Sequence, residues 1–250
     1  MKNIFYALFA VCALASCSES YVIQGSSTLS LLEGNKLYLK EIRDRNLKSL
    51  DSCDVVHGKF RFSGILDTTL MAAVFMNDQM VLPLVVERGD ISIRIEDTQQ
   101  NKVSGSPLNE VLYSFLDRYN QLRNDLIELS HRESRMLLDG ISEDTISAEI
   151  SREAAIIGQR EDSLVTNFVV SNFENVLGPF IFIQMSSSLP QIEHIWSKAP
   201  DSFKNQTDVM SFYRHVTSDS ERSLHGGDNP GSTSPQDIDD ATIQDILNGR

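Results

Sequence analysis

Cysteine is the residue type in this 250-residue sequence with the widest choice of chemistry. A thiolate can attack a disulfide, bind a metal or carry a covalent group. The three cysteines are Cys12, Cys17 and Cys53. No two of them have the Cys-x-x-Cys spacing in which one sulfur attacks a disulfide and its neighbour resolves the mixed intermediate. The residues around Cys17 indicate a processing signal instead.

The residues before Cys17 follow the order of a secretory signal. Lys2 is basic, residues 4–14 (IFYALFAVCAL) are uncharged and apolar, and two small residues follow. The apolar run is about 11 residues long and reaches only about half of a ~30 Å hydrocarbon core. The end of the leader, Leu-Ala-Ser-Cys, resembles the lipobox of bacterial lipoproteins, in which the cysteine sulfur is acylated and the leader is cut just before it. An ordinary signal peptide with an incidental cysteine is the alternative.

The lipobox resemblance implies a signal peptide at 1–16, a lipidated N-terminus at 17–20 and a membrane anchor at Cys17. Each buried methylene contributes about 0.8 kcal/mol, so two or three acyl chains hold a protein firmly. Ser18 is not the aspartate that, by analogy with Gram-negative systems, retains a lipoprotein at the inner membrane. We therefore expect an outer-membrane lipoprotein of the cell envelope, with the periplasmic and surface faces both open.

The cysteines and the overall composition of the sequence limit the covalent links and the classes of partner that we expect. Cys12 leaves with the leader and Cys17 is capped by lipid, so Cys53 remains as a single thiol and we expect no intrachain disulfide. The formal net charge of −13 argues against nucleic acid or an anionic lipid surface as a partner. The hydrophobic share of 41% supports a packed core.

Other catalytic or metal-binding patterns are absent from the sequence. It has no Gly-x-Ser-x-Gly nucleophile elbow and no His-Glu-x-x-His zinc motif. The acidic run at Asp237, Asp239 and Asp240 lacks the glycine and distal glutamate of a calcium loop. We therefore expect no catalytic residue, metal or cofactor. The histidines have no paired ligand spacing, and we expect structural or exposed positions for all five: His57, His131, His194, His215 and His225.

Short alternating runs separated by turn residues predict strands in the first part of the chain. Phe60 and Phe62 share one face of such a run, as do Ile91, Ile93 and Ile95. The fold class that this pattern favours is α+β, with an N-terminal antiparallel β-sandwich or barrel at 21–105. The expected strands are 21–25, 36–42, 48–55, 59–63, 71–76, 80–86 and 91–95.

After residue 105 the period changes to that of helices. Ser106 can cap a helix, Pro107 suits its first turn, and apolar residues then recur at spacings of three and four. Gly140 is a plausible stop and Ser142 a plausible restart. Two long helices would form an antiparallel hairpin, followed by a buried apolar piece after Gly178-Pro179 and shorter helices at 192–196 and 209–215. The α-helical domain is expected at 106–216.

The end of the chain has the composition of a flexible acidic tail. Residues 217–235 are rich in Ser, Asp and Gly and predict a linker. A short amphipathic helix could follow, as a docking element for another protein, as a segment that folds back, or as one that frays. Its apolar residues are Ile238, Ile243, Ile246 and Leu247.

Residues 50–64, LDSCDVVHGKFRFSG, resemble the D-S-x-x-V-x-x-G-K-F-x-F-x-G hairpin of a domain of unknown function. That domain stands at the N-terminus of many lipid-anchored thiol–disulfide oxidoreductases of the thioredoxin-like TlpA/ResA type. Gly25 with the run 34–39 (GNKLYL), and 86–93 (VERGDISI) closed by 103–109 (VSGSPLN), resemble other parts of it, so the coverage is roughly 21–110. Cys53 occupies a position that is usually small, which suits a buried packing role.

The sequence departs from this family where the family carries its chemistry. The Cys-x-x-Cys of the family lies in a C-terminal thioredoxin fold, and the residues after His215 are too few for a ~100-residue domain. The resemblance therefore implies a non-catalytic cell-envelope lipoprotein that binds a protein partner or small ligand through its β-domain or its hairpin. The alternative is an accessory subunit of a thiol–disulfide redox system that acts with a separate thioredoxin-like protein. A third possibility is an enzyme of unfamiliar type.

Overall fold

All seven stretches predicted to be strands are strands in the computed structural model, which describes residues 20–43, 46–96 and 101–224. An eighth strand, β8, and a short 3₁₀ helix, η1, were not predicted, because three residues are too few to show a period. The elements are β1 (Ser20–Ser27), η1 (Ser30–Leu32), β2 (Lys36–Arg43), β3 (Asn46–Asp54), β4 (Lys59–Ile65), β5 (Leu70–Met76), β6 (Gln79–Val86), β7 (Gly89–Ile95) and β8 (Lys102–Ser104).

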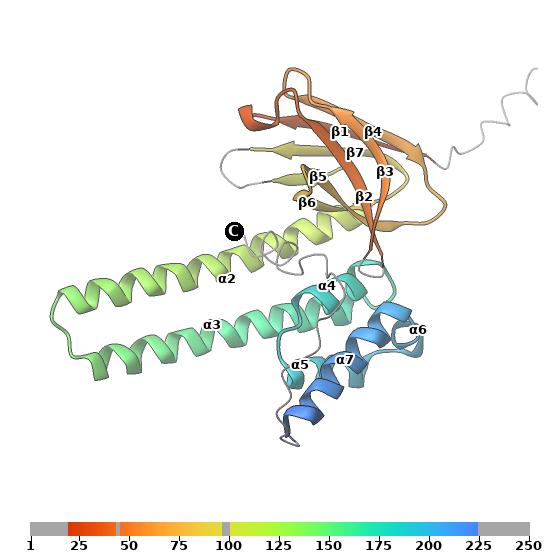
Figure 1. Ribbon diagram of the computed structural model, residues 1–250. Coiled ribbons are helices and arrows are strands. Elements are labelled where there is room, and N and C mark those ends of the chain that lie inside the picture. The colour runs from red at the N-terminus through yellow and green to blue at the C-terminus, as the bar shows by residue number, and fades with distance from the viewer. Residues whose placement is uncertain (1–19, 44–45, 97–100, 225–250) are drawn as a thin grey trace, which may run out of the picture.

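The strands form two four-stranded sheets that together make the β-domain (Figure 1). The strand orders are β4-β1-β7-β8 and β3-β2-β5-β6, and there is no closed barrel. The prediction of antiparallel pairing was wrong for one pair, because β1 and β7 run parallel. Side-chain alternation is the same in parallel and antiparallel strands, so it carries no information about direction. The buried faces of both sheets contribute to one hydrophobic core.

Two glycines in the first sheet lie under aromatic rings of the neighbouring strand. Gly25 pairs with Phe60, and a Cβ at Gly25 would overlap the Phe60 ring. Gly64 pairs with Tyr21, and a Cβ there would lie 2.8 Å from the tyrosine oxygen. In both cases an aromatic ring on one strand fills the space above the glycine of the other strand. These contacts explain Gly64 of the motif at 50–64 and Gly25, a separate part of the same resemblance.

The predicted helical hairpin is confirmed and extends well beyond the β-domain (Figure 1). It consists of α2 (Pro107–Leu138) and α3 (Glu143–Ser171), and Gly140 takes a φ of 78° between them. Ser106 precedes α2 as predicted, but its hydroxyl accepts a hydrogen bond from the Asn109 amide and caps no backbone N–H. Shorter helices pack against the end of the hairpin nearest the β-domain: α4 (Leu177–Met185), α5 (Leu189–Lys198), α6 (Asp201–Lys204) and α7 (Thr207–Leu224).

The sequence prediction for these shorter helices needs two corrections. Gly178-Pro179 does not break the chain before the apolar run but lies in the first turn of α4, where proline needs no N–H partner. The predicted linker does not begin at residue 217, because α7 continues to Leu224. Polar residues can extend a helix once its first turns are held by packing, as Val209 is here.

The β-domain and the hairpin meet at β6, an edge strand of the second sheet. The Val85 N–H donates to the Asn109 side-chain oxygen with an N–O distance of 2.8 Å. The Asn109 side-chain nitrogen donates in return to the Val85 carbonyl at 2.7 Å. Asn109 is fully buried, so its amide replaces the neighbouring strand that β6 lacks.

The same edge of β6 has two further side-chain partners. The Tyr113 hydroxyl donates to the Pro83 carbonyl at 2.9 Å, and the Asn101 amide donates to the Val81 carbonyl at 3.4 Å. Val81, Pro83 and Val85 alternate along the strand, so their main-chain groups point away from β5. Pro83 has no N–H to leave unpaired on this side, which is why a proline is tolerated in β6.

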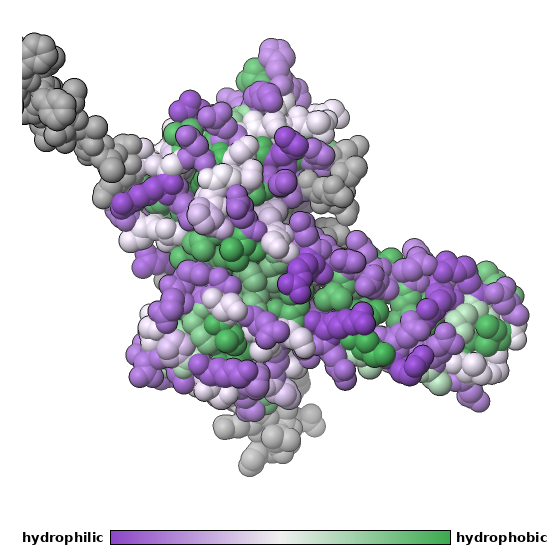
Figure 2. Space-filling view, turned by 180° about the vertical axis from the view of Figure 1, so that it is seen from behind, coloured by the Kyte–Doolittle hydropathy of each residue, from purple (hydrophilic) through white to green (hydrophobic). Residues whose placement is uncertain are grey.

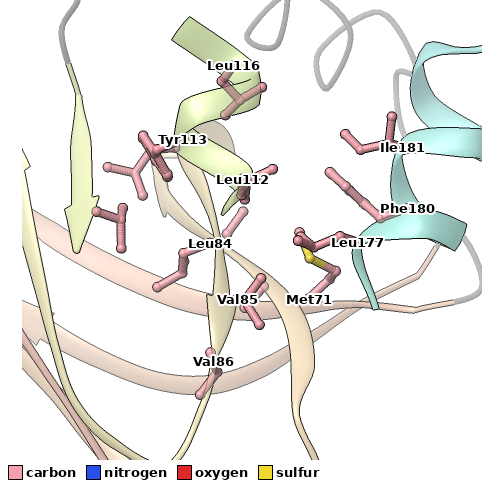
Figure 3. Packing of buried hydrophobic residues seen from close by; sticks show 14 of the residues in the cluster. Met71, Leu84, Val85, Val86, Leu112, Tyr113, Leu116, Leu177, Phe180 and Ile181 are labelled. Carbon is pink, nitrogen blue, oxygen red and sulfur yellow. The ribbon is translucent and has the colours of Figure 1, made fainter. Parts of the chain in front are cut away.

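An apolar layer continues this junction. Figure 3 shows side chains of α2, α4, β5 and β6 that point toward one another around the start of α2. The labelled members are Met71, Leu84, Val85, Val86, Leu112, Tyr113, Leu116, Leu177, Phe180 and Ile181. The apolar run of α4 is buried as predicted, because it packs against both the β-domain and the other helices.

Replacing Asn109 should destabilise the whole fold. In Asn109→Ala the buried N–H and C=O of Val85 lose their partner, and each unsatisfied group costs about 1–3 kcal/mol. We expect the free energy of unfolding to fall by about 2–4 kcal/mol in urea denaturation. The control is Asn124→Ala on an exposed position of the same helix. A loss no larger than that of the control would show that the Asn109 contact is dispensable.

Candidate functional site

Cys53 lies on β3, half-buried against the core, and its sulfur accepts a hydrogen bond from the Arg61 N–H on β4. Burial raises the pKa of the thiol, and the charges of Asp51 and Asp54 raise it further, while the hydrogen bond from Arg61 lowers it. The sum is a pKa above the ordinary cysteine value. A disulfide is attacked by the thiolate, so this environment opposes a nucleophilic role for Cys53.

Asp51 makes a parallel contact two residues earlier on β3. Its carboxylate accepts the Ser63 N–H of β4 at 2.9 Å and the Ser52 N–H at 2.8 Å. β3 and β4 are edge strands of different sheets, so Asp51 and Cys53 join the two sheets with side chains where no backbone ladder forms. The resemblance had placed Cys53 in a packing role, and the structure adds that it is only half-buried.

The turn between β3 and β4 is held by the carboxylate of Glu33, the residue that follows η1. Both oxygens of Glu33 accept backbone N–H groups, from His57 at 2.8 Å and from Gly58 at 2.7 Å. These bonds lower the pKa of Glu33, with Gly58 contributing most. His57 and Gly58 have positive φ angles of 52° and 66°, and a Cβ at Gly58 would lie 2.5 Å from the Ser27 carbonyl oxygen. The histidine and glycine of this motif therefore shape the turn.

The remaining histidines are dispersed. His131, His194 and His215 lie at exposed positions on α2, α5 and α7. In the ranges that the structure describes, no three His, Cys, Asp or Glu residues gather in a way that could hold a metal ion. Among those same residues, no helix has both the length and the apolar character to cross a membrane. Cys17, His225 and the predicted docking residues Ile238, Ile243, Ile246 and Leu247 lie outside the described residues.

The feature that sequence reasoning missed is the apolar tip of the hairpin, formed by Leu137, Leu138 and Ile141. The side chains of Leu138 and Leu137 are 87% and 52% exposed, and Ile141 is exposed as well. Figure 2 shows apolar surface at the far end of the hairpin. Three carboxylates stand beside these residues in the sequence: Asp139, Glu143 and Asp144. The signal in the sequence was the Leu-Leu pair next to Gly140, which continues no apolar stripe.

The outer part of the hairpin is held by one seam between two helices. Leu129 of α2 and Ile146 and Ile157 of α3 are the buried apolar side chains of this part of the described hairpin. Beside this seam, Arg132 of α2 pairs with Glu153 of α3 at 2.6 Å. The tip is therefore supported by a regular helix pair, which presents its apolar side chains at the end of a long arm.

The comparison with protein families distinguishes the β-domain from the outer hairpin and the later helices. Residues 21–112 match the family model described as "Domain of unknown function (DUF4369)". The chain contains a DUF4369 domain. The match covers the β-domain and the first turns of α2, so Asn109 and Leu112 belong to it, whereas the outer hairpin and α3–α7 lie beyond it. No curated protein and no solved structure matches the chain.

The DUF4369 match at residues 21–112 confirms the coarser prediction of a domain of unknown function over roughly 21–110, which includes the motif at 50–64. The residues of that motif to which the structure gives partners all serve the architecture of the domain. Asp51 and Cys53 bind β4, Gly58 turns the chain, and Gly64 receives Tyr21. None of these contacts forms a catalytic arrangement. The partnered residues of this motif therefore hold the scaffold of the domain.

Cys53 should react slowly in the folded protein. In a form that begins at Ser18, Cys53 is the sole cysteine, and its alkylation by iodoacetamide can be followed by mass spectrometry. Because burial raises the pKa of this thiol, we expect the pH profile of the rate to lie at higher pH in folded than in urea-unfolded protein.

The matched control places the thiol on the neighbouring, exposed position, in Ser52→Cys combined with Cys53→Ser. This thiol should react at close to the unfolded rate. If Cys53 itself reacted as fast in the folded as in the unfolded protein, its burial would not protect it.

Proposed function

We propose that this protein is a lipid-anchored protein of the cell envelope that binds a protein partner through the apolar tip of its hairpin. The observation that carries the proposal is the exposure of Leu137, Leu138 and Ile141 together at the end of the arm. Grouped apolar side chains on an otherwise charged surface mark interaction sites. Burying one leucine contributes about 1.5–3 kcal/mol, so a partner that covers the tip gains from each of the three.

The charges near the tip specify the kind of surface that would receive it. Asp139 follows Leu138 directly, and Glu143 and Asp144 come shortly after Ile141 in the chain. A complementary partner has an apolar recess with basic residues at its rim, and such charge pairs set orientation and association rate. The overall negative charge of the chain likewise favours a basic partner.

The anchor in this proposal rests on the leader and on Cys17. A basic start, an apolar run and Leu-Ala-Ser-Cys support acylation at that cysteine. The accessory role beside a separate thioredoxin-like protein stays a prediction from the resemblance to proteins in which this domain precedes a thioredoxin fold. The raised pKa of Cys53 adds no support to it.

The tip can be tested in the native host with a photo-crosslinking amino acid at position 138. We expect a specific cross-linked protein, and we expect Leu138→Glu to weaken its affinity for that partner at least about tenfold, because a charge replaces a buried leucine. The matched control is Ile156→Glu, which makes the same kind of change at a side chain 41% exposed on α3 away from the tip. Equal binding by the Leu138→Glu and Ile156→Glu proteins would exclude the tip as the interface.

The anchor has a separate test. The protein purified from its native host should begin at residue 17 and carry the mass of two or three acyl chains, and it should remain with membranes after washing at high salt. In Cys17→Ala we expect the acyl mass and the membrane retention to be lost together. An unmodified N-terminus on the host's own protein would refute the anchor.

A further inference from the structure

The β-domain has two ends, and one of them receives the chain from the predicted anchor. Ser20 opens β1, where it pairs with Ile65 at the end of β4, and the next residue, Tyr21, pairs with Gly89 at the start of β7. Leu70, at the start of β5, follows β4 through a short connection, and Val86, at the end of β6, precedes β7 through another. Leu70 and Val86 pair with each other. The strand ends at this side are called the Ser20 end.

The Ser20 end lies close to Cys17 along the chain. Three peptide units separate Cys17 from Ser20, and three residues of fully extended chain span at most about 11 Å. A pair of facing residues on neighbouring antiparallel strands has Cα atoms about 5 Å apart, so Ile65 lies within roughly 16 Å of Cys17. The Ile65 side chain is 82% exposed at this end.

The hairpin starts near the Ser20 end and points away from it. Along α2, Asn109 contacts Val85 and Tyr113 contacts Pro83. The helix therefore advances along β6 toward the lower-numbered residues of that strand. Four helical residues rise about 6 Å and two strand residues about 6.6 Å, so helix and strand run alongside each other in opposite directions. Leu138 then lies about 44 Å beyond Asn109 along the helix axis. Figure 1 shows the hairpin leaving the β-domain on the side opposite the start of β1.

These placements decide how an anchored molecule would be oriented. We propose that the Ser20 end, with Ile65, rests on the surface of the anchoring bilayer and that the hairpin holds the apolar tip away from it. This inference rests on the lipid anchor of the proposed function and deepens it. The partner at the tip is then a protein outside the anchoring bilayer, reached across a gap of tens of ångströms.

The charges at the Ser20 end suit a zwitterionic bilayer. Asp67, Glu87, Arg88 and Asp90 lie at this end; the Arg88 guanidinium donates to the Asp67 carbonyl, and the Glu87 carboxylate accepts the Leu108 N–H. Arg43 of β2 is a second base here, because Glu41 pairs with Ala72 of β5. The three carboxylates outnumber these two bases, so anionic headgroups would gain little from this group. A zwitterionic surface has no net charge to repel these carboxylates. It can therefore receive the exposed Ile65 side chain without an electrostatic penalty.

The experiment uses the chain 17–250 coupled through the Cys17 thiol to a maleimide lipid in phosphatidylcholine vesicles that also contain spin-labelled, quenching lipids. Coupling near neutral pH favours Cys17 over the half-buried Cys53, and mass spectrometry verifies a single adduct. A fluorophore is introduced through a non-canonical amino acid at position 65, 138 or 31. Leu31 is the matched control, because its side chain is 69% exposed at the opposite end of the β-domain.

We expect quenching at position 65 to be at least about threefold stronger than at positions 31 and 138. Quenching at 138 equal to that at 65 would show the hairpin lying on the bilayer and would overturn the inference. Weak quenching at all three positions would overturn it too, because the Ser20 end would then not touch lipid. The coupling bypasses natural acylation, so these outcomes are distinct from the failure of the anchor, which appears as an unmodified Cys17 in the host's protein.

Discussion

The junction between Asn109 and β6 is the contact on which the rest of the molecule depends. An edge strand of a sheet exposes N–H and C=O groups that invite pairing with another chain. Here a buried amide on a helix bonds to both groups of Val85, and Tyr113 bonds to the next outward carbonyl. The same contacts close the sheet and set the direction of α2. The arm is therefore held by the geometry of the β-domain and not by a flexible connection.

A second set of side-chain bonds gives the motif at residues 50–64 its role in this chain. Two sheets that share no backbone ladder at β3 and β4 are joined there by Asp51 and Cys53, each bonded to an N–H of the opposite strand. Glu33 holds the turn that connects these strands. The family resemblance predicts a packing role for the cysteine in this position. In the fold it is a half-buried hydrogen-bond acceptor, and burial raises the pKa of its thiol.

The hairpin combines a firmly held base with a lightly held end. Near the β-domain it is covered by α4–α7, whereas its outer part depends on the seam of Leu129, Ile146 and Ile157 and on ion pairs such as Arg132 with Glu153. When a partner covers exposed apolar side chains at the end of such an arm, these side chains lose their contact with water. The contacts in the rest of the molecule can stay as they are.

The sequence by itself determined the seven main strands, the two long helices and the stop at Gly140, because alternation, helical period and turn residues are local properties of the chain. It also determined the DUF4369 resemblance, because the order of short motifs is written in the chain. Only the tertiary structure decided the parallel pairing of β1 with β7, the bond of Asn109 to Val85 and the contact of Cys53 with Arg61, since each joins residues far apart in the sequence. The exposure of the tip belongs to the same class. The Leu137-Leu138 pair continues no apolar stripe, but only the fold shows that these side chains are 52% and 87% exposed.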